Sequence, residues 1–364
     1  MTTKHYDYLL VGQGLAGSLL GYSLAKRGSS IMILDNYEQP SSSRVAAGIY
    51  NPVTGRKLVK TWLADTIFPF LKTYYTELEK ELGKNFFHPM PMFRPFPNQE
   101  VKDFLLQETA VANYGDFGQY HTPAESLKSV VKSELGGVMT DHSGWVELPL
   151  MLDAFREYFE KKQCLLQHLF DNQGLHLENN TYQVNIELTL TFNKLIFCEG
   201  FYGRNNPYFS WLPFNPVKGE VLRVKFKEDI SLKEMVNQGV FVIPLPNGRA
   251  RVGATYSWHD LDWIPTEKGR ADLLEKYNKL MLADIEVEEQ LAGVRPATKD
   301  RRPIVGLHPV HTNLGVFNGL GSKGVSLAPY FAEQFVDFLV NKKELDPEVN
   351  INRFGSLYLG QKQS

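Results

Sequence analysis

Three glycines near the N-terminus constrain the fold more than any other feature of this sequence. They lie within "YDYLLVGQGLAGSLLGYSLAKRGSSIMILDN", residues 6–36, at Gly12, Gly14 and Gly17. The apolar run before them is short and ends at a glycine, which is typical of a buried parallel strand. Apolar residues then recur with helical spacing over 15–27, and Gly28 is a suitable helix stop. A second apolar strand ends at Asp35, so the stretch predicts a strand–helix–strand unit.

Each glycine has its own expected role in binding a dinucleotide. Gly12 permits the tight turn, Gly14 lets the backbone approach a pyrophosphate, and Gly17 lets the helix pack closely on the sheet. The N–H groups and the positive dipole end at the start of the helix would face the phosphates. Asp35 would accept hydrogen bonds from both adenosine ribose hydroxyls, and its charge argues against a 2′-phosphate and therefore against NADP.

This motif alone does not separate FAD from NAD, or from a glycine turn that binds no nucleotide. A second loop rich in small residues, "SSSRVAAGIYNPVTGRK", occupies residues 41–57. Ala46, Ala47 and Gly48 would allow a flat ring system to approach the backbone. An ordinary polar loop is the alternative interpretation.

The composition sets further bounds on the class of protein. The 364 residues suit two domains, and 43% hydrophobic with 22% charged residues is enough to build a core. A net charge of −2 gives no sign of the clustered basic face that nucleic-acid binding needs. Cys164 and Cys198 form no CxxC pair, so we expect neither a disulfide framework nor a structural zinc site. We expect a cytoplasmic protein, because no signal peptide or long apolar span is evident.

The rest of the chain alternates between two kinds of sequence pattern, one typical of α/β units and one typical of antiparallel strands. Residues 60–82 predict a helix, the prolines of "FFHPMPMFRPFP" predict a break in regular structure, and a helix restarts after Pro149. From residue 216, strands such as "VLRVKF" alternate strictly, which predicts an antiparallel sheet with one exposed face, and a helix follows Thr266. The C-terminal part then repeats the strand–glycine loop–helix pattern of the N-terminal stretch, with a strand, the loop "LGSKG" and a helix over 325–340.

The order of these motifs resembles the D-amino-acid oxidase superfamily of flavoproteins. Within it, the chain is similar to the glycine oxidases and to the FAD-dependent domain of bifunctional enzymes that modify the wobble uridine of tRNA. The resemblance covers most of the chain and favours FAD over NAD. The motifs that carry it are "LLVGQGLAGSLLGYSLAKRG" with Asp35, "SSSRVAAG", "PVKGEVLRV", "VGATY", "AGVRPATKDRRPIVG" and "NGLGSKGVSLAPYFAEQ".

The resemblance implies a fold that combines the α/β and α+β classes. A discontinuous Rossmann-like FAD-binding domain would comprise residues 1–60, 144–215 and 291–364. A second domain, an antiparallel sheet with helices that binds the substrate, would comprise residues 61–143 and 216–290.

It also implies which residues hold FAD, without a covalent bond. The first glycine motif would bind the ADP half, and the second loop and the loop before the last helix would lie along the flavin. That helix would point its positive end at the pyrimidine end of the ring, where reduced flavin carries negative charge, and Lys323 would add to this effect. The expected cofactor-binding residues are Gly12, Gly14, Leu15, Ala16, Gly17, Asp35, Asn36, Arg44, Ala46, Ala47, Gly48, Gly200, Gly319, Leu320, Gly321, Ser322, Gly324 and Val325.

On the substrate side, Arg295 matches the arginine that binds the substrate carboxylate in glycine oxidase. An arginine suits this task because its planar fork binds a carboxylate bidentately and stays charged. A structural salt bridge is the alternative. Tyr256 would line the pocket, or be a core or rim aromatic. Phe241 stands where glycine oxidase has a tyrosine, which puts glycine itself in doubt as substrate. We expect Arg295, Tyr256 and Lys323 to act in the reaction.

The implied reaction is oxidation of a small-molecule amine or amino acid, in which hydride passes from the α-carbon to the flavin and water hydrolyses the resulting imine. Oxygen or another acceptor would then reoxidise the flavin. Two alternatives remain: oxidation of a glycine-like side chain on a tRNA wobble uridine, which the net charge disfavours, and a binding protein with a structural FAD. His308 and His311 lie in a loop without an evident third ligand, so we expect no metal site.

Overall fold

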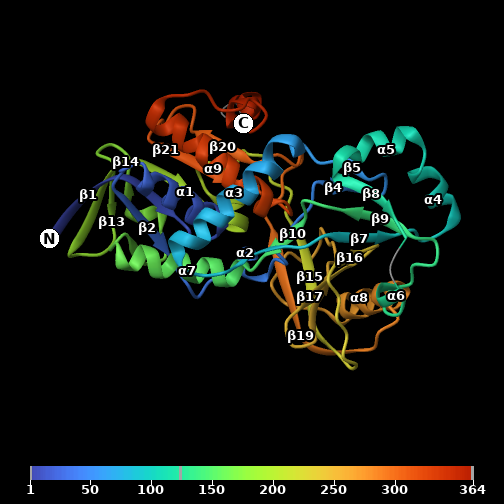
Figure 1. The fold of residues 1–364 in the computed structure, drawn as a ribbon. Helices are drawn as coiled ribbons and strands as arrows, with labels where there is room; N and C mark the ends of the chain where they lie inside the picture. Colours follow the sequence, from blue (N-terminus) through green and yellow to red (C-terminus); the bar gives the residue numbers. More distant parts are fainter. Residues whose placement is uncertain (1, 123–124, 362–364) are drawn as a thin grey trace.

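The computed structural model describes residues 2–122 and 125–361. Figure 1 shows two lobes side by side, with both ends of the chain in the same lobe. The chain passes between the lobes more than once, so each lobe is assembled from segments that are distant in sequence. This arrangement confirms the predicted mixed α/β and α+β fold class.

The first lobe is built on a sheet whose central strands are parallel. β1 (Thr2–Val11) pairs in parallel with β2 (Ile31–Asp35) and with β14 (Leu188–Phe197), and β14 pairs in parallel with β21 (Leu314–Asn318). The other members are β11 (Leu165–Gln167), β12 (Leu175–His176), β13 (Thr181–Gln183) and β20 (Ile304–Leu307). The carboxyl ends of the parallel strands meet at one edge, which is where open α/β sheets bind their ligands.

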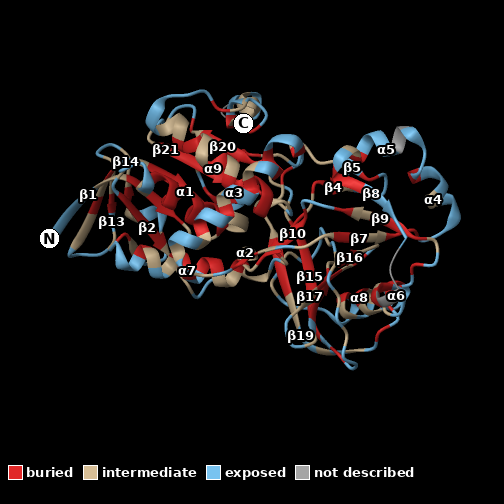
Figure 2. Cartoon of the chain, in the orientation of Figure 1, coloured by how far each residue is buried: buried red, intermediate tan, exposed pale blue. Residues whose placement is uncertain are grey.

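Helices from three distant segments cover this sheet. α1 (Leu15–Lys26) and α9 (Gly324–Asn341) pack against each other, and α7 (Leu148–Lys161) joins them in the same hydrophobic core. The apolar spacing read over 15–27 and 325–340 therefore predicted these helices correctly. Figure 2 shows that their inner faces and the strands beneath them are buried.

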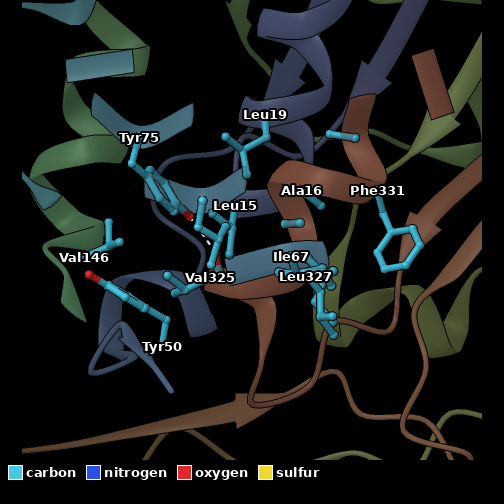
Figure 3. Close-up of a cluster of buried hydrophobic side chains, with 14 of the residues drawn as sticks. Leu15, Ala16, Leu19, Tyr50, Ile67, Tyr75, Val146, Val325, Leu327 and Phe331 are labelled. Atoms are coloured by element: carbon cyan, nitrogen blue, oxygen red, sulfur yellow. Dashed lines mark hydrogen bonds between the residues drawn. The ribbon is translucent and has the colours of Figure 1, made fainter. Parts of the chain in front are cut away.

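α3 (Ala64–Leu82) also belongs to this core. It packs on α9, and the Tyr75 hydroxyl donates a hydrogen bond of 2.8 Å to the Val325 carbonyl oxygen at the start of α9 (Figure 3). The sequence analysis assigned residues 61–143 to the substrate domain, whereas the packing groups α3 with the first lobe. The domain boundaries as a whole stay a prediction.

The second lobe contains one large sheet. Its strands, in spatial order, are β19 (Ile285–Arg295), β15 (Val217–Phe226), β18 (Arg249–Gly253), β17 (Phe241–Leu245), β16 (Met235–Asn237), β7 (Met92–Pro95), β9 (Gly137–Thr140) and β8 (Gly118–His121). All pairs are antiparallel except β16 with β7. Leu222, Val224 and Phe226 of β15 are buried in one hydrophobic core with Leu273 and Tyr277 of α8 (Glu267–Leu280). The predicted alternation thus forms the face that α8 covers.

Two local expectations were wrong. The proline-rich stretch forms β6 (Phe87–Pro89) and β7 rather than a break. β6 is an edge strand of its sheet, where proline is tolerated, and Pro95 is the last residue of β7. The stretch "SSSRVAAG" contains a short helix, α2 (Ser42–Val45), and the Ser42 hydroxyl donates a hydrogen bond to the Val294 carbonyl oxygen.

The remaining elements connect the lobes or lie at their edges. β6 forms a small sheet with β10 (Gly144–Val146) and β3 (Ile49–Tyr50). The others are β4 (Val53–Thr54), β5 (Val59–Lys60), α4 (Gln99–Leu105), α5 (Glu108–Tyr114), α6 (Glu125–Lys128), α10 (Gly355–Gln361) and the 3₁₀ helices η1 (Gly115–Phe117), η2 (Asn172–Gly174), η3 (Gly200–Asn205) and η4 (Ile351–Phe354). None of the helices described has the length and apolar character needed to cross a membrane.

Candidate functional site

A cavity of about 580 Å³ lies where the two lobes meet. The first lobe contributes the carboxyl ends of β1, β2 and β14 and the start of α9, while the second lobe contributes residues of β15, β17 and β19. Among the residues that the sequence analysis selected, those lining the cavity are Gly12, Gly14, Leu15, Ala16, Asp35, Asn36, Arg44, Ala46, Ala47, Gly48, Gly200, Tyr256, Arg295, Leu320, Gly321, Ser322, Lys323, Gly324 and Val325.

Gly17 and Gly319, also selected, do not line the cavity and instead pack beneath it. A Cβ atom on Gly17 would lie 1.8 Å from the Gly12 carbonyl oxygen, so α1 can start this close to the turn only with glycine there. Gly319 has a φ of +72°, and a Cβ atom on it would lie 2.8 Å from Thr298 Cγ2. The structure therefore gives both glycines a packing position.

The turn between β1 and α1 directs N–H groups into the cavity. Gly12 has a φ of +101°, which a side chain would strain. The Leu15 N–H donates to the Ser43 hydroxyl at 3.1 Å, whereas the N–H groups of Gly14 and Ala16 have no backbone acceptor among residues 2–122 and 125–361. These donors and the positive end of α1 suit a diphosphate. The sequence reasoning missed Ser43, because its loop was read for its small residues only.

Asp35 lies at the end of β2, where a ribose-binding acid is expected. Its Oδ2 atom accepts a hydrogen bond of 2.7 Å from the Gln13 N–H. Burial raises the pKa of this carboxyl, and the Gln13 N–H and the cations Arg156 and Arg44 oppose that rise. The ionised form thus has nearby positive charge, as an acceptor of two hydroxyl hydrogen bonds needs.

Arg156 of α7 completes this end of the cavity, and the sequence reasoning missed it. Its guanidinium carbon lies 3.6 Å from the centre of the Tyr37 ring, and Nη2 donates to Gln13 Oε1 at 3.3 Å. Its Nε atom is buried and has no hydrogen-bond partner among the residues described. The helical pattern of α7 indicated only the apolar face, so nothing in the sequence marked this polar residue.

At the other end of the cavity, two tight backbone segments face each other. Gly48 has a φ of +74°, and a Cβ atom there would lie 2.0 Å from the Val146 carbonyl oxygen. Gly321, with a φ of +54°, precedes the N-terminus of α9. Burial lowers the pKa of Lys323, and the neighbouring cations Arg302 and Arg301 lower it further. This end of the cavity therefore combines close backbone with positive charge.

Arg295, the last residue of β19, lies on the second-lobe side. Its Nη1 and Nη2 atoms each lie 3.3 Å from the Thr255 carbonyl oxygen, and Nη1 lies 3.4 Å from that of Lys218. Within the described part of the chain, no carboxylate pairs with it. Burial lowers the pKa of Arg295, but an arginine stays charged at neutral pH. The charged guanidinium of Arg295, which has no carboxylate partner among the described residues, thus faces the cavity.

Gly219 of β15 makes room for this guanidinium. A Cβ atom on Gly219 would lie 2.0 Å from Arg295 Nη2, so the fork can lie against the strand only where there is no side chain. This glycine lies in the stretch "PVKGEVLRV", and no role was predicted for it from the sequence. A glycine within an alternating strand was the available signal.

Tyr256 and Phe241, the two aromatic residues discussed for the substrate side, occupy different positions in the cavity. Tyr256 is 60% exposed at the rim of the cavity, and the guanidinium carbon lies 4.5 Å from its ring centre. Phe241 of β17 lines the cavity and covers Gly253, where a Cβ atom would lie 2.7 Å from the Phe241 ring. The part of the cavity wall formed by Phe241 therefore carries a phenyl ring without a hydroxyl.

Glu199 at the end of β14 is an acid that the sequence reasoning left without a role. Burial raises its pKa to about 7, against the lowering effect of Asn206, whose Nδ2 donates to Oε2 at 2.8 Å. Its neighbour Cys198 is buried, and burial raises the pKa of that thiol. The backbone of both residues lies beside the Gly12 turn.

The His308 ring and the Arg302 side chain have structural partners. The His308 Nδ1 atom accepts hydrogen bonds from the N–H groups of Val310 and His311. Residues 2–122 and 125–361 contain no group of three metal-ligating side chains. Arg302 pairs with Glu348 at 3.4 Å and lies over the Trp62 ring.

Comparison with known proteins gives matches along nearly the whole chain. The family described as "DAO: FAD dependent oxidoreductase" matches residues 7–338. Glycine oxidase of Bacillus subtilis is 24% identical over 93% of this chain and 94% of its own length. The bifunctional protein MnmC of Marinobacter nauticus, named for tRNA 5-methylaminomethyl-2-thiouridine biosynthesis, is 24% identical over 90% of this chain, which spans 54% of that protein. The crystal structure of glycine oxidase from Geobacillus kaustophilus has a TM-score of 0.77 at 23% identity, covering 96% of this chain and 98% of that one.

Proposed function

This chain belongs to the DAO family of FAD-dependent oxidoreductases, and from that premise we propose that it oxidises the C–N bond of an amino acid or N-substituted glycine. FAD would be held without a covalent bond, and hydride would pass from the α-carbon of the substrate to the flavin. The name of the B. subtilis relative supports a substrate of this class.

The residues of the cavity fit FAD. The free N–H groups at Gly14 and Ala16 and the positive end of α1 would hold the pyrophosphate, and Asp35 would hold the ribose. The flavin would lie between Gly48 and the loop that starts at Leu320. When bound, the flavin supplies the hydride acceptor, and the protein supplies orientation and electrostatics.

The second lobe would orient the substrate. Arg295 would bind the carboxylate through two parallel hydrogen bonds, which fixes the α-carbon relative to the cofactor. Tyr256 would hold the guanidinium from the solvent side, and Phe241 would exclude water from the opposite wall. Lys323 and the N-terminus of α9 would stabilise negative charge that develops at the far side of the ring.

One observation carries this proposal: the charged fork of Arg295 faces the cavity while no carboxylate in the described part of the chain pairs with it. A buried cation of this kind is stabilised when an anion binds beside it. A carboxylated substrate supplies such an anion.

The test is anaerobic mixing of the FAD-loaded protein with a panel of D-amino acids and N-substituted glycines. We expect at least one carboxylated amine to bleach the flavin absorbance band, and the matched amine without a carboxylate to bleach it much more slowly. Peroxide formed after admitting air would identify oxygen as the acceptor. If the protein binds FAD and no carboxylated amine reduces it, the proposed reaction is wrong.

Oxidation of a glycine-like side chain on a tRNA wobble uridine is the second candidate. Two observations favour it: the loop "GSKGVSLAP", which resembles that family, and the position of Arg301 and Arg302 close enough to lower the pKa of Lys323. The MnmC relative is named for a tRNA modification, although this chain spans about half of it. A gel shift with unmodified and modified tRNA distinguishes this candidate from a small-molecule oxidase.

Replacement of Arg156 by leucine should weaken FAD binding about tenfold, because the carboxylate of Asp35 would lose a nearby cation and its pKa would rise further. Titration of the apoprotein with FAD, followed by quenching of flavin fluorescence, measures the affinity. Lys161→Leu on the exposed side of the same helix is the control and should leave the affinity unchanged. Equal affinities of the Arg156→Leu variant and the control would show that Arg156 does not support the cofactor.

A further inference from the structure

A buried arginine outside the cavity has no hydrogen bond or ion pair among the residues that the structure describes. Arg251, in the middle of β18, is 8% exposed. Its Nη1 atom is fully buried and unbonded, and within the chain segments described its guanidinium takes part in no hydrogen bond or ion pair. A buried charge without hydrogen bonds is strongly unfavourable, so a hydrogen-bond acceptor beside the guanidinium would stabilise the folded protein.

Two further nitrogen atoms that make no hydrogen bond within the described residues lie near it. The Arg251 guanidinium carbon is 5.3 Å from the centre of the Trp145 ring of β10. The His88 ring of β6 stacks on Trp145 with ring centres 4.2 Å apart. Trp145 Nε1 and His88 Nε2 are both buried and have no hydrogen-bond partner among the described residues. Three neighbouring strands thus bring three unsatisfied polar groups together.

The charged groups around Arg251 do not neutralise it. Arg223 lies directly opposite on β15 and forms its own ion pair with Glu289 at 2.6 Å. Glu147 attracts Arg251 but does not reach ion-pair distance from it, and its Oε2 atom lies 3.9 Å from His88 Nε2. Among the described residues, Arg251 is therefore attracted by Glu147 from a distance but makes no direct ion pair.

The position of the cluster separates it from the substrate site. Trp145 packs in a small core with Ala47 and Phe241, which line the large cavity, but Arg251, Trp145 and His88 do not line it. A ligand here would lie behind the wall of the cavity, at nitrogen atoms that are buried. Buried donors from a guanidinium and an indole select a small anion.

We propose that Arg251, Trp145 and His88 bind a small monovalent anion such as chloride. The guanidinium supplies the charge and the indole N–H supplies directed hydrogen bonding. His88 contributes when Nε2 carries the ring proton. This site is independent of the proposed amine oxidation, since it uses none of the residues assigned to the substrate or to FAD.

The experiment compares thermal unfolding of the FAD-loaded protein in sodium chloride and in sodium gluconate at one ionic strength. Chloride should raise the unfolding midpoint by about 2–4 °C, because a ligand that binds only the folded state stabilises it. Arg251→Met keeps the length of the side chain, removes the charge and should abolish the difference. Arg223→Met, the register neighbour on β15, should retain it.

Trp145→Phe provides a second variant in case Arg251→Met does not fold. It preserves the ring contacts with Arg251 and His88 but removes the indole donor, so the chloride effect should shrink. In crystals grown with bromide, anomalous scattering should place an ion beside the guanidinium. Equal midpoints of the wild-type protein in both salts, or a chloride effect that survives Arg251→Met, would overturn the proposal.

Discussion

Replacement of Arg295 by leucine should reduce kcat/KM for a carboxylated amine by about 10²- to 10³-fold, because removing one partner of a buried charge pair leaves the other uncompensated. Flavin content should be unchanged, since Arg295 lies on the second-lobe side of the cavity. Stopped-flow bleaching of the flavin under anaerobic conditions gives the rate and the substrate affinity separately. We expect both to deteriorate, because the carboxylate anchor also orients the α-carbon.

Two matched variants sharpen this test. Gly219→Ala leaves Arg295 in place, but its Cβ would lie 2.0 Å from Nη2, so the fork must move and activity should fall in the same direction. Arg301→Leu removes an exposed arginine that follows soon after and should have little effect on a small substrate. An Arg295→Leu enzyme that is reduced by the carboxylated substrate as fast as the wild type would refute the anchoring role.

Replacement of Gly17 by alanine should destabilise the protein by about 4 kcal/mol or prevent folding, because the new methyl group meets backbone that cannot move aside. Its Cβ would lie 1.8 Å from the Gly12 carbonyl oxygen and 3.0 Å from the Gly12 carbonyl carbon. Denaturant unfolding of the apoprotein measures the loss directly, without a contribution from bound cofactor.

Gly14→Ala separates packing from cofactor binding in the same motif. Gly14 has a φ of −77°, which alanine also adopts, and a Cβ there would lie 3.5 Å from its nearest neighbour, Ser43 Oγ. Stability of the apoprotein should therefore stay within about 0.5 kcal/mol of wild type. FAD affinity should fall about tenfold or more, because the methyl group would stand where we propose that the backbone meets the pyrophosphate. If both variants lost only FAD affinity, the packing role of Gly17 would be wrong.

The end of the cavity at the β1–α1 turn was predictable because the residues that form it are close together in sequence. Gly12, Gly14 and Asp35 belong to one strand–helix–strand unit, and each spacing follows from the geometry of that unit. The apolar faces of α1 and α9 could be recognised from the spacing of apolar residues in the sequence. The glycines of the loop before α9 could be recognised as well. Short-range patterns of this kind can be recognised in the sequence without knowledge of the tertiary structure.

The side chains that reach the cavity from elsewhere were not predictable. Arg156 is one of several polar residues on an amphipathic helix, and Gly219 is the only glycine in β15. Their importance depends on which elements lie opposite, and no spacing along one segment encodes that. The two proline-containing strands were missed for a similar reason: whether a proline disturbs a sheet depends on its place in the ladder, which pairing decides.

The interleaving of distant segments in the first lobe has a consequence for how the protein is made. β1 aligns Thr2 with Leu188, and β14 in turn aligns Leu195 with Leu314. During synthesis, the emerging chain has the first glycine turn long before β21 and α9 leave the ribosome. The cavity is therefore completed only near the end of translation. Until then, the edge of β14 that later pairs with β21 is open to pairing with other chains. A ribosome stalled before residue 314 should release a product that aggregates and takes up no flavin.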